Sequence, residues 1–515
     1  MKLLREIDLP WADHKSIAYW IDEQIWGHRV WDNQTPWLIF LEFLGIVDSA
    51  QREGKLLDEG GKFYPLLFNP LQRMALRNIL YNNSQIVQYI LDKNPEDGRA
   101  WAEWNSWIKD HARGVVDRDF SYVKDRFLSF EEFAQLLGML QSATVESESN
   151  RRWSSRFLFP FGESCLYEDV NISAQGKPSR EYINFGRTGE LLYLMLCRSS
   201  VAEQLQPHLE AIVTAKNPWN SLVAQLQNDD QPQASTRGQS YLPYTSHKAF
   251  DLLGEDLLQL FERGLPQFDA YPHLTLMSAF HVMLYQLVVS SQLCHDERPL
   301  MICEIVAPRK TLVRELSIIS YQKNSQLSSN AVSTFINNIV TSDDWKKAKA
   351  EPDSFPQCKE LLNQLVAWPR EDDDYDGAHD PDFLIRSLKQ SALARHRQHA
   401  ANVHRSYGRS VGLISKRGTN KLRYAPNDSL LKAMILANVP DRMEFKEFLN
   451  RIFVRYGIVI GEREAKEVME DSDFDNKAFQ SNANRLEHRL SSLGMLKRLS
   501  DACAYVLNPY AGGSK

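Results

Sequence analysis

The feature of this sequence that most restricts the folded protein is a basic stretch, Phe383 to Asn427, which contains ten Lys or Arg residues and no Asp or Glu. The 515-residue chain has a formal net charge of −6, so removing those ten positive charges leaves −16 for the rest. Cationic side chains without acidic neighbours repel one another, and the stretch therefore needs a counter-charge. A localised basic region on an otherwise acidic protein is typical of proteins that bind a polyanion.

Two sources of counter-charge are open. An acidic cluster within residues 371–382 lies directly before the stretch and could neutralise it, or phosphates could do so. We favour phosphates as the counter-charge. The expected partner is therefore a nucleic acid, and its expected form is duplex DNA. A weak apolar stripe predicts a helix to about His404, whereas three glycines predict a loop from Gly408 to Asn427. The predicted nucleic-acid-binding residues here are Arg395, Arg397, Arg405, Arg409, Lys416, Arg417, Lys421 and Arg423.

Length and composition indicate a soluble, multidomain protein. A chain of 515 residues exceeds a single hydrophobic core, and its 43% apolar and 24% charged residues are ordinary for a globular protein. The six Cys form no C-x-x-C pair and the amino terminus lacks an apolar signal segment, which favours reduced thiols and a cytoplasmic location. The most apolar run, Leu274 to Leu293, is interrupted by polar residues, so we expect a buried helix and no membrane partner.

The expected fold is mainly α and multidomain, with a helical N-terminal half, a small α+β insertion and a C-terminal winged-helix-like domain. Capping residues followed by proline, such as Thr35-Pro36, predict helix starts in the first part of the chain. Short strands are expected at 156–161, 165–172 and 181–185. The predicted units are a helical domain 1–148, an α+β segment 149–227, a linker 228–245, a helical domain 246–370 with a short strand, an acidic linker 371–382, the basic segment 383–427 and the winged-helix-like domain 428–511.

A second anion site is considered at the start of the apolar helix that begins near residue 188. Arg187, Thr188 and Gly189 stand where free backbone N–H groups and a guanidinium could hold a phosphate. Glu190 in the first turn could instead complement the helix dipole as a plain cap. The spacing is not that of a P-loop, because the Lys-Ser/Thr pair is missing.

The last part of the chain has the pattern of three helices followed by a hairpin. Apolar residues from Phe445 to Tyr456 follow a helical period, a later helix is expected from about Lys477 to Leu493, and two short strands are expected between Met495 and Leu507. This pattern resembles a winged-helix domain. The resemblance makes the third helix the recognition helix. Its implied contact residues, with those of the wing, are Arg485, Arg489, Lys497 and Arg498. A winged helix used only for protein contact is the alternative.

Taken whole, the chain resembles the accessory proteins encoded in prokaryotic anti-phage islands, which work beside a separate ATPase or nuclease. With this context, the basic segment and the lack of a catalytic motif lead to the hypothesis of a non-catalytic DNA-binding or sensing subunit of a multiprotein complex, without cofactor or metal. A protein–protein scaffold is one alternative. A metal-dependent nuclease is another, but its candidate residues are scattered along the chain: Glu304, His281, His295, Asp380 and Asp382.

Overall fold

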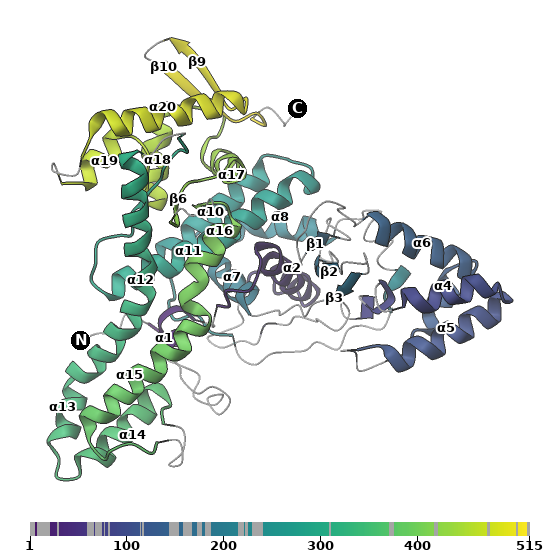
Figure 1. The fold of residues 1–515 in the computed structure, drawn as a ribbon, viewed down its shortest axis with the longest axis horizontal. Coiled ribbons are helices and arrows are strands. Elements are labelled where there is room, and N and C mark those ends of the chain that lie inside the picture. The colour runs from purple at the N-terminus through teal and green to yellow at the C-terminus, as the bar shows by residue number, and fades with distance from the viewer. Residues whose placement is uncertain are drawn as a thin grey trace.

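The computed structural model describes residues 6–7, 21–27, 30–58, 66, 75–76, 78–80, 83–113, 115, 118–143, 154–157, 167–172, 178–180, 187–214, 221, 225–228, 240–307, 311–369, 375–416, 421–470, 474–500 and 503–511. Within these residues the protein is mainly α-helical with small sheets, as the sequence predicts (Figure 1).

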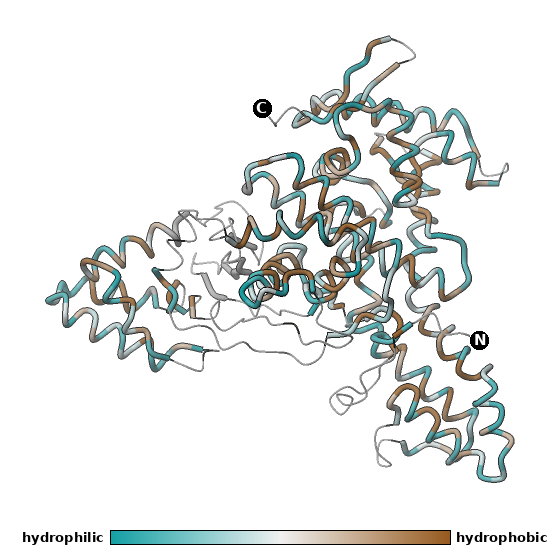
Figure 2. The backbone as a smooth tube through the Cα atoms, turned by 180° about the vertical axis from the view of Figure 1, so that it is seen from behind, coloured by the Kyte–Doolittle hydropathy of each residue, from teal (hydrophilic) through white to brown (hydrophobic). Residues whose placement is uncertain are grey.

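Apolar helices from distant parts of the sequence build the central core. Thr35 caps the second of them as predicted, because its Oγ1 accepts a hydrogen bond from Leu38 N at 3.4 Å and Pro36 occupies the first turn. Hydrophobic segments gather where these helices pack together (Figure 2). The central helices are α1 (Ile21–Trp26), α2 (Pro36–Arg52), α7 (Thr188–Cys197), α8 (Ala202–Thr214), α10 (Lys248–Glu262) and α11 (Gln267–Leu293).

Helix α11 is the most apolar long helix of the described chain. Its segment Asp269–Leu293 is long and apolar enough to cross a membrane, but 89% of the most apolar window is buried inside the protein. The burial makes α11 the central helix of the core, as the sequence predicts for this run.

A second, smaller core lies in a lobe formed by α4 (Ser84–Lys93), α5 (Asp97–His111) and α6 (Phe130–Ala143). Trp101 and Trp104 are buried there, with ring centroids 5.9 Å apart in an edge-on arrangement. These rings therefore serve packing. The nearby sheet has the order β1-β2-β3, formed by β1 (Ser154–Phe157), β2 (Tyr167–Ile172) and β3 (Pro178–Arg180). The expected strand at 181–185 lies outside the described residues.

The long helix α12 (Leu312–Thr341) leads away from the core to α13 (Asp343–Ala350) and α14 (Ser354–Val366), and the basic segment returns along it (Figure 1). The basic segment departs from the expected single helix and loop. It forms α15 (Pro381–Gln398), a short turn, α16 (Val403–Ser410) and a hairpin of β5 (Ile414–Ser415) with β6 (Arg423–Tyr424). The break comes at His399, whose backbone leaves the helical conformation and whose Nδ1 lies 2.9 Å from Asp32 Oδ1.

The remaining residues form a C-terminal module of helices and a three-stranded antiparallel sheet. The expected hairpin is present, and the sheet order β7-β10-β9 adds a strand from between the helices. Gly494 follows the last helix with a φ of +71°, the left-handed geometry that favours glycine there. The elements are α17 (Asp428–Asn438), β7 (Arg442–Glu444), α18 (Phe445–Tyr456), β8 (Ile458–Val459), α19 (Glu462–Val468), α20 (Asn476–Ser492), β9 (Leu496–Ser500) and β10 (Cys503–Leu507).

Candidate nucleic-acid interface

The C-terminal module is joined to the core by the segment between α11 and α12. Its strand β4 (Met301–Ile302) pairs in parallel with β8, and Cys303 N donates to Val459 O at 2.9 Å. One residue later Glu304 N donates to Tyr424 O at 3.0 Å, so the same segment also contacts β6. This short segment therefore meets both the module and the basic segment.

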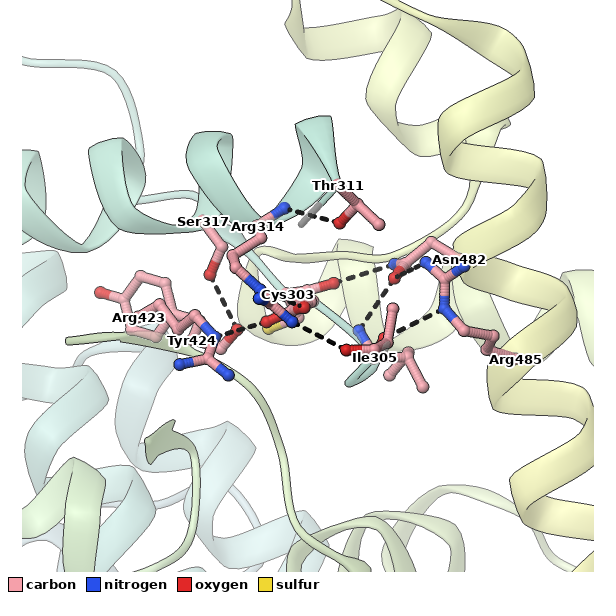
Figure 3. Close-up of polar contacts among 11 residues, drawn as sticks. Cys303, Ile305, Thr311, Arg314, Ser317, Arg423, Tyr424, Asn482 and Arg485 are labelled. Carbon is pink, nitrogen blue, oxygen red and sulfur yellow. Dashed lines mark hydrogen bonds and ion pairs between the residues drawn. The ribbon is translucent and has the colours of Figure 1, made fainter. Parts of the chain in front are cut away.

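Glu304 is the charged centre of this junction. Its side chain is fully buried, and its Oε1 accepts a hydrogen bond from Arg314 Nε at 2.8 Å (Figure 3). Its other carboxylate oxygen accepts from Nε of Arg423, which is 1% exposed. A buried carboxylate needs such partners, because desolvating an unpaired charge is very costly. The two ion pairs of Glu304 therefore connect the 301–307 segment with α12 and with β6.

Asn482 sets the position of α20 against the same segment. Its Oδ1 accepts from Ile305 N at 2.8 Å, and its Nδ2 donates to Cys303 O at 2.9 Å and Ile460 O at 3.0 Å. The side chain is fully buried, so these bonds satisfy groups that water cannot reach. One face of α20 is thereby held against the core, and its orientation is determined by backbone groups of the neighbouring segments.

Arg485 and Arg489 of α20 lie together, as the helical spacing predicts. Arg485 Nε donates to Ile305 O at 3.1 Å, and Arg489 donates to Pro426 O at 3.0 Å and pairs with Asp428 at 2.5 Å. Both arginines line a pocket of about 270 Å³ with Ile305, Val306 and His488. His488, three residues after Arg485 on the same helix, lines this pocket as well.

The two predicted wing residues lie on β9. Lys497 is exposed, and so is Arg498, whose Nε donates to Glu487 Oε1 of α20 at 2.8 Å. Strand β9 is thus linked to α20 through an ion pair whose arginine side chain remains half exposed.

Most predicted residues of the basic segment face solvent. Arg397, Arg405, Arg409, Lys416 and Lys421 are exposed, and Arg395 is half-buried. Arg417 lies outside the described residues.

Arg423 requires a correction. It is buried and paired with Glu304, so it cannot reach a phosphate on the surface. Strand β6 turns this one side chain inward, where the carboxylate of a residue 119 positions earlier meets it.

Two of the described acidic residues before the basic segment are engaged elsewhere. Asp380 caps α15 by accepting from Phe383 N at 2.9 Å, and Asp382 pairs with Lys349 at 2.5 Å. Residues 371–374 of the cluster lie outside the described residues.

The predicted anion site at the start of α7 also requires a correction. Gly189 N donates to Glu42 Oε2 at 2.7 Å, Thr188 donates to Gln34, and Arg187 pairs with Glu190 at 2.8 Å. Thr188 is fully buried, and a Cβ on Gly189 would lie 2.6 Å from Glu42 Cγ. The anion at this helix start is the chain's own carboxylate, which leaves no space for an external phosphate.

The residues named for a nuclease do not converge in the described chain. Glu304 is paired with arginines, and His281 Nε2 lies 2.7 Å from the buried Asp256 Oδ2. His295 is exposed beyond the end of α11. No group of three His, Cys, Asp or Glu side chains in the described residues is placed to hold a metal ion.

The buried His404 next to Arg423 predicts sensitivity to acid. Its Nε2 lies 2.8 Å from the Tyr424 hydroxyl, and burial lowers the pKa of His404 to about 3. An unfolded histidine has a pKa of about 6.5, so below that pH the unfolded chain binds a proton that the folded chain does not, and stability falls as the pH drops. We expect both His404→Gln and His404→Phe to reduce the loss of unfolding free energy between about pH 6.5 and pH 5 by about 2 kcal/mol. Guanidinium denaturation at the two pH values measures this, and variants that keep the wild-type loss would contradict it.

Comparison with known families bears on this arrangement. Residues 384–508 match the family model described as methylation-associated defense system protein MAD7. No curated protein and no solved structure matched the chain. The match to MAD7 supports the predicted resemblance to anti-phage defence accessory proteins and covers about a quarter of the chain.

The bounds of the MAD7 match agree with the contacts. The matched residues begin in α15 and end just after β10, so the match spans most of the basic segment and the C-terminal module together. Asn427 N donates to Gly412 O at 2.8 Å, and Asp428 pairs with Arg489, which connects α16 to α20 within this unit. The match begins after Glu304, so the carboxylate that pairs with Arg423 lies outside it.

Sequence reasoning missed the polar residues that hold the interface in place. Asn482 and Glu487 are the two polar residues among the buried residues of α20, and a polar residue beside an apolar stripe was a usable signal. Arg314, Ser317 and Tyr424 carried no local signal, because their partners are more than six residues away in sequence.

Proposed function

We propose that this chain is a non-catalytic, DNA-binding subunit of a prokaryotic anti-phage defence system, and that it contacts duplex DNA through its basic segment and C-terminal module. The observation that carries the proposal is the exposure of five cationic side chains of the basic segment, Arg397, Arg405, Arg409, Lys416 and Lys421. Exposed cations that are not consumed by the described acidic cluster remain available for phosphates.

The topology of the C-terminal module supports a winged-helix interpretation. A strand follows α17, two longer helices follow it with the short α19 between them, and the hairpin β9–β10 completes a sheet of order β7-β10-β9. In winged-helix proteins the helix before the hairpin enters the major groove. That helix is α20 in this chain, and it carries Arg485, His488 and Arg489 on one side.

Defence-system proteins act together with other proteins, and the similarity to a defence family favours the same for this chain. We propose a separate ATPase or nuclease as the catalytic partner.

Removing two exposed arginines of α16 is expected to weaken DNA binding. The variant Arg405→Gln with Arg409→Gln should lower affinity for duplex DNA about tenfold or more, because two phosphate contacts are lost. Each lost contact should also reduce the slope of log affinity against log salt concentration by about one. Within the described residues neither arginine pairs with a carboxylate, and Arg405 donates only weakly to Asn402 at 3.3 Å. Fluorescence anisotropy of a labelled duplex at several salt concentrations measures both quantities.

The matched control removes two positive charges elsewhere. Lys346 and Lys347 are exposed on α13, at the opposite end of the molecule from α20 (Figure 1). Replacing both with Gln changes the net charge equally and should leave affinity almost unchanged. Equal losses in the two variants would mean that only overall charge matters, and unchanged affinity in the α16 variant would contradict the proposed interface.

A further inference from the structure

We propose that the pocket between α20 and residues 305–306 is a phosphate-binding site. This inference rests on the proposed function for its location beside the helix expected to read DNA, but its chemistry stands on the pocket's own residues. The pocket holds about 270 Å³, and Ile305, Val306, Arg485, His488 and Arg489 line it. Three of these five side chains can donate hydrogen bonds to an anion.

Both pocket arginines have N–H groups that their contacts within the protein do not use. A guanidinium has five N–H groups. Arg485 uses one at Nε for Ile305 O, one at Nη1 for Ser481 Oγ and one at Nη2 for Asn482 Oδ1, all within 3.2 Å. Two of its N–H groups are therefore not committed to these bonds. Arg489 uses Nε for Asp428 and Nη1 for Pro426 O, which leaves three.

Existing contacts hold the two guanidinium groups in place before any ligand arrives. Arg485 is anchored to the backbone of the 301–307 segment, and Arg489 to the backbone just before α17. Prepositioned donors bind better, because less side-chain entropy is lost when the ligand arrives. Planar guanidinium groups also match the geometry of phosphate oxygens.

The local charge balance favours an anion. Asp428 is the carboxylate that pairs with Arg489, and its side chain is half exposed to water. Glu304 also attracts the Arg485 cation electrostatically, but the Glu304 carboxylate is already paired with Arg314 and Arg423. Partial burial lowers the pKa of Arg485, although an arginine stays protonated in a protein. The partly buried Arg485 guanidinium is therefore stabilised when an anion binds in the pocket.

The phosphate has two possible sources, the backbone of DNA or a free phosphate group, and one set of variants separates them. Inorganic phosphate is titrated into the full chain at constant ionic strength and followed by the ³¹P line width, and DNA affinity is measured in parallel. Arg489→Gln and His488→Ala should each weaken phosphate binding, the first by about tenfold. His488 is exposed and its ring makes no hydrogen bond or ion pair within the described residues, so His488→Ala tests the pocket without risk to the fold. Lys477→Gln removes an exposed charge in the first turn of the same helix and should have no effect.

Each outcome decides one of the two proposals. Loss of both phosphate and DNA affinity in the pocket variants supports a site for a backbone phosphate. Loss of phosphate affinity alone supports a site for a free phosphate group. If DNA binds normally while phosphate fails to bind the wild-type chain and the pocket variants bind DNA unchanged, the pocket proposal is wrong and the proposed function stands. If phosphate binds in the pocket but no duplex is retained, the proposed function fails instead.

Discussion

Replacing Glu304 with Ala is expected to lower the free energy of unfolding by about 3–5 kcal/mol, the range found when one partner of a buried ion pair is removed. The reason is Arg423, whose side chain is 1% exposed and whose guanidinium would lose its carboxylate without gaining water. Arg314 is 13% exposed and can turn partly toward solvent, so most of the loss comes from Arg423. Thermal and urea denaturation of the variant beside the wild type measure the change.

An exposed ion pair of the C-terminal module is the control. Asp428 pairs with Arg489 but is 52% exposed, so Asp428→Ala should cost no more than about 1 kcal/mol. A double variant, Glu304→Leu with Arg423→Met, should recover much of the loss, because replacing a buried pair by apolar side chains is often neutral. A single Glu304→Ala variant as stable as the wild type would show that the junction does not depend on this charge.

The second large effect is expected at Asp256, the fully buried carboxylate that connects α10 and α11 with the C-terminal module. Its Oδ2 accepts from His281 at 2.7 Å and from the Tyr456 hydroxyl at 2.6 Å, while Arg455 bonds Oδ1 at 2.5 Å. Asp256→Ala leaves these buried donors unsatisfied, and we expect a loss of about 3–5 kcal/mol. Hydrogen exchange should show the weakening in α18, which carries both Arg455 and Tyr456.

The neighbouring residue gives a close control for this prediction. Glu255 bonds the same Arg455 at 2.7 Å, but its side chain is 42% exposed. Glu255→Ala should therefore cost no more than about 1 kcal/mol. Similar losses in the two variants would mean that Arg455, and not the buried carboxylate network, stabilises this contact.

Local signals in the sequence predicted much of the secondary structure. The cap and proline at Thr35 and Pro36 start α2, and the apolar period from Phe445 to Tyr456 becomes the buried face of α18. Helix starts and amphipathic faces depend on residues within a few positions of one another, so their physical cause can be read from a short window. The same logic placed Arg485 and Arg489 on one side of α20.

The candidate interface was predictable only in part. The excess of cations between Phe383 and Asn427 was visible in the sequence, and so was a helix start at Gly189 suited to an anion. The burial of Arg423 could not be predicted, because a strand of two residues has too little pattern to show which side faces inward. The contact of Glu42 with the helix start could not be predicted either, because the two positions are 147 residues apart in the sequence.

What the sequence by itself determined about this protein is its mainly helical character and the segregation of positive charge beside its C-terminal module. Only the tertiary structure decided which of those charges face water, because the carboxylates that remove Arg423 and the anion site from the surface come from positions more than a hundred residues away. Because removing a charge from water is costly, a charged side chain is buried only beside an opposite charge, and that pairing exists only after the chain has folded.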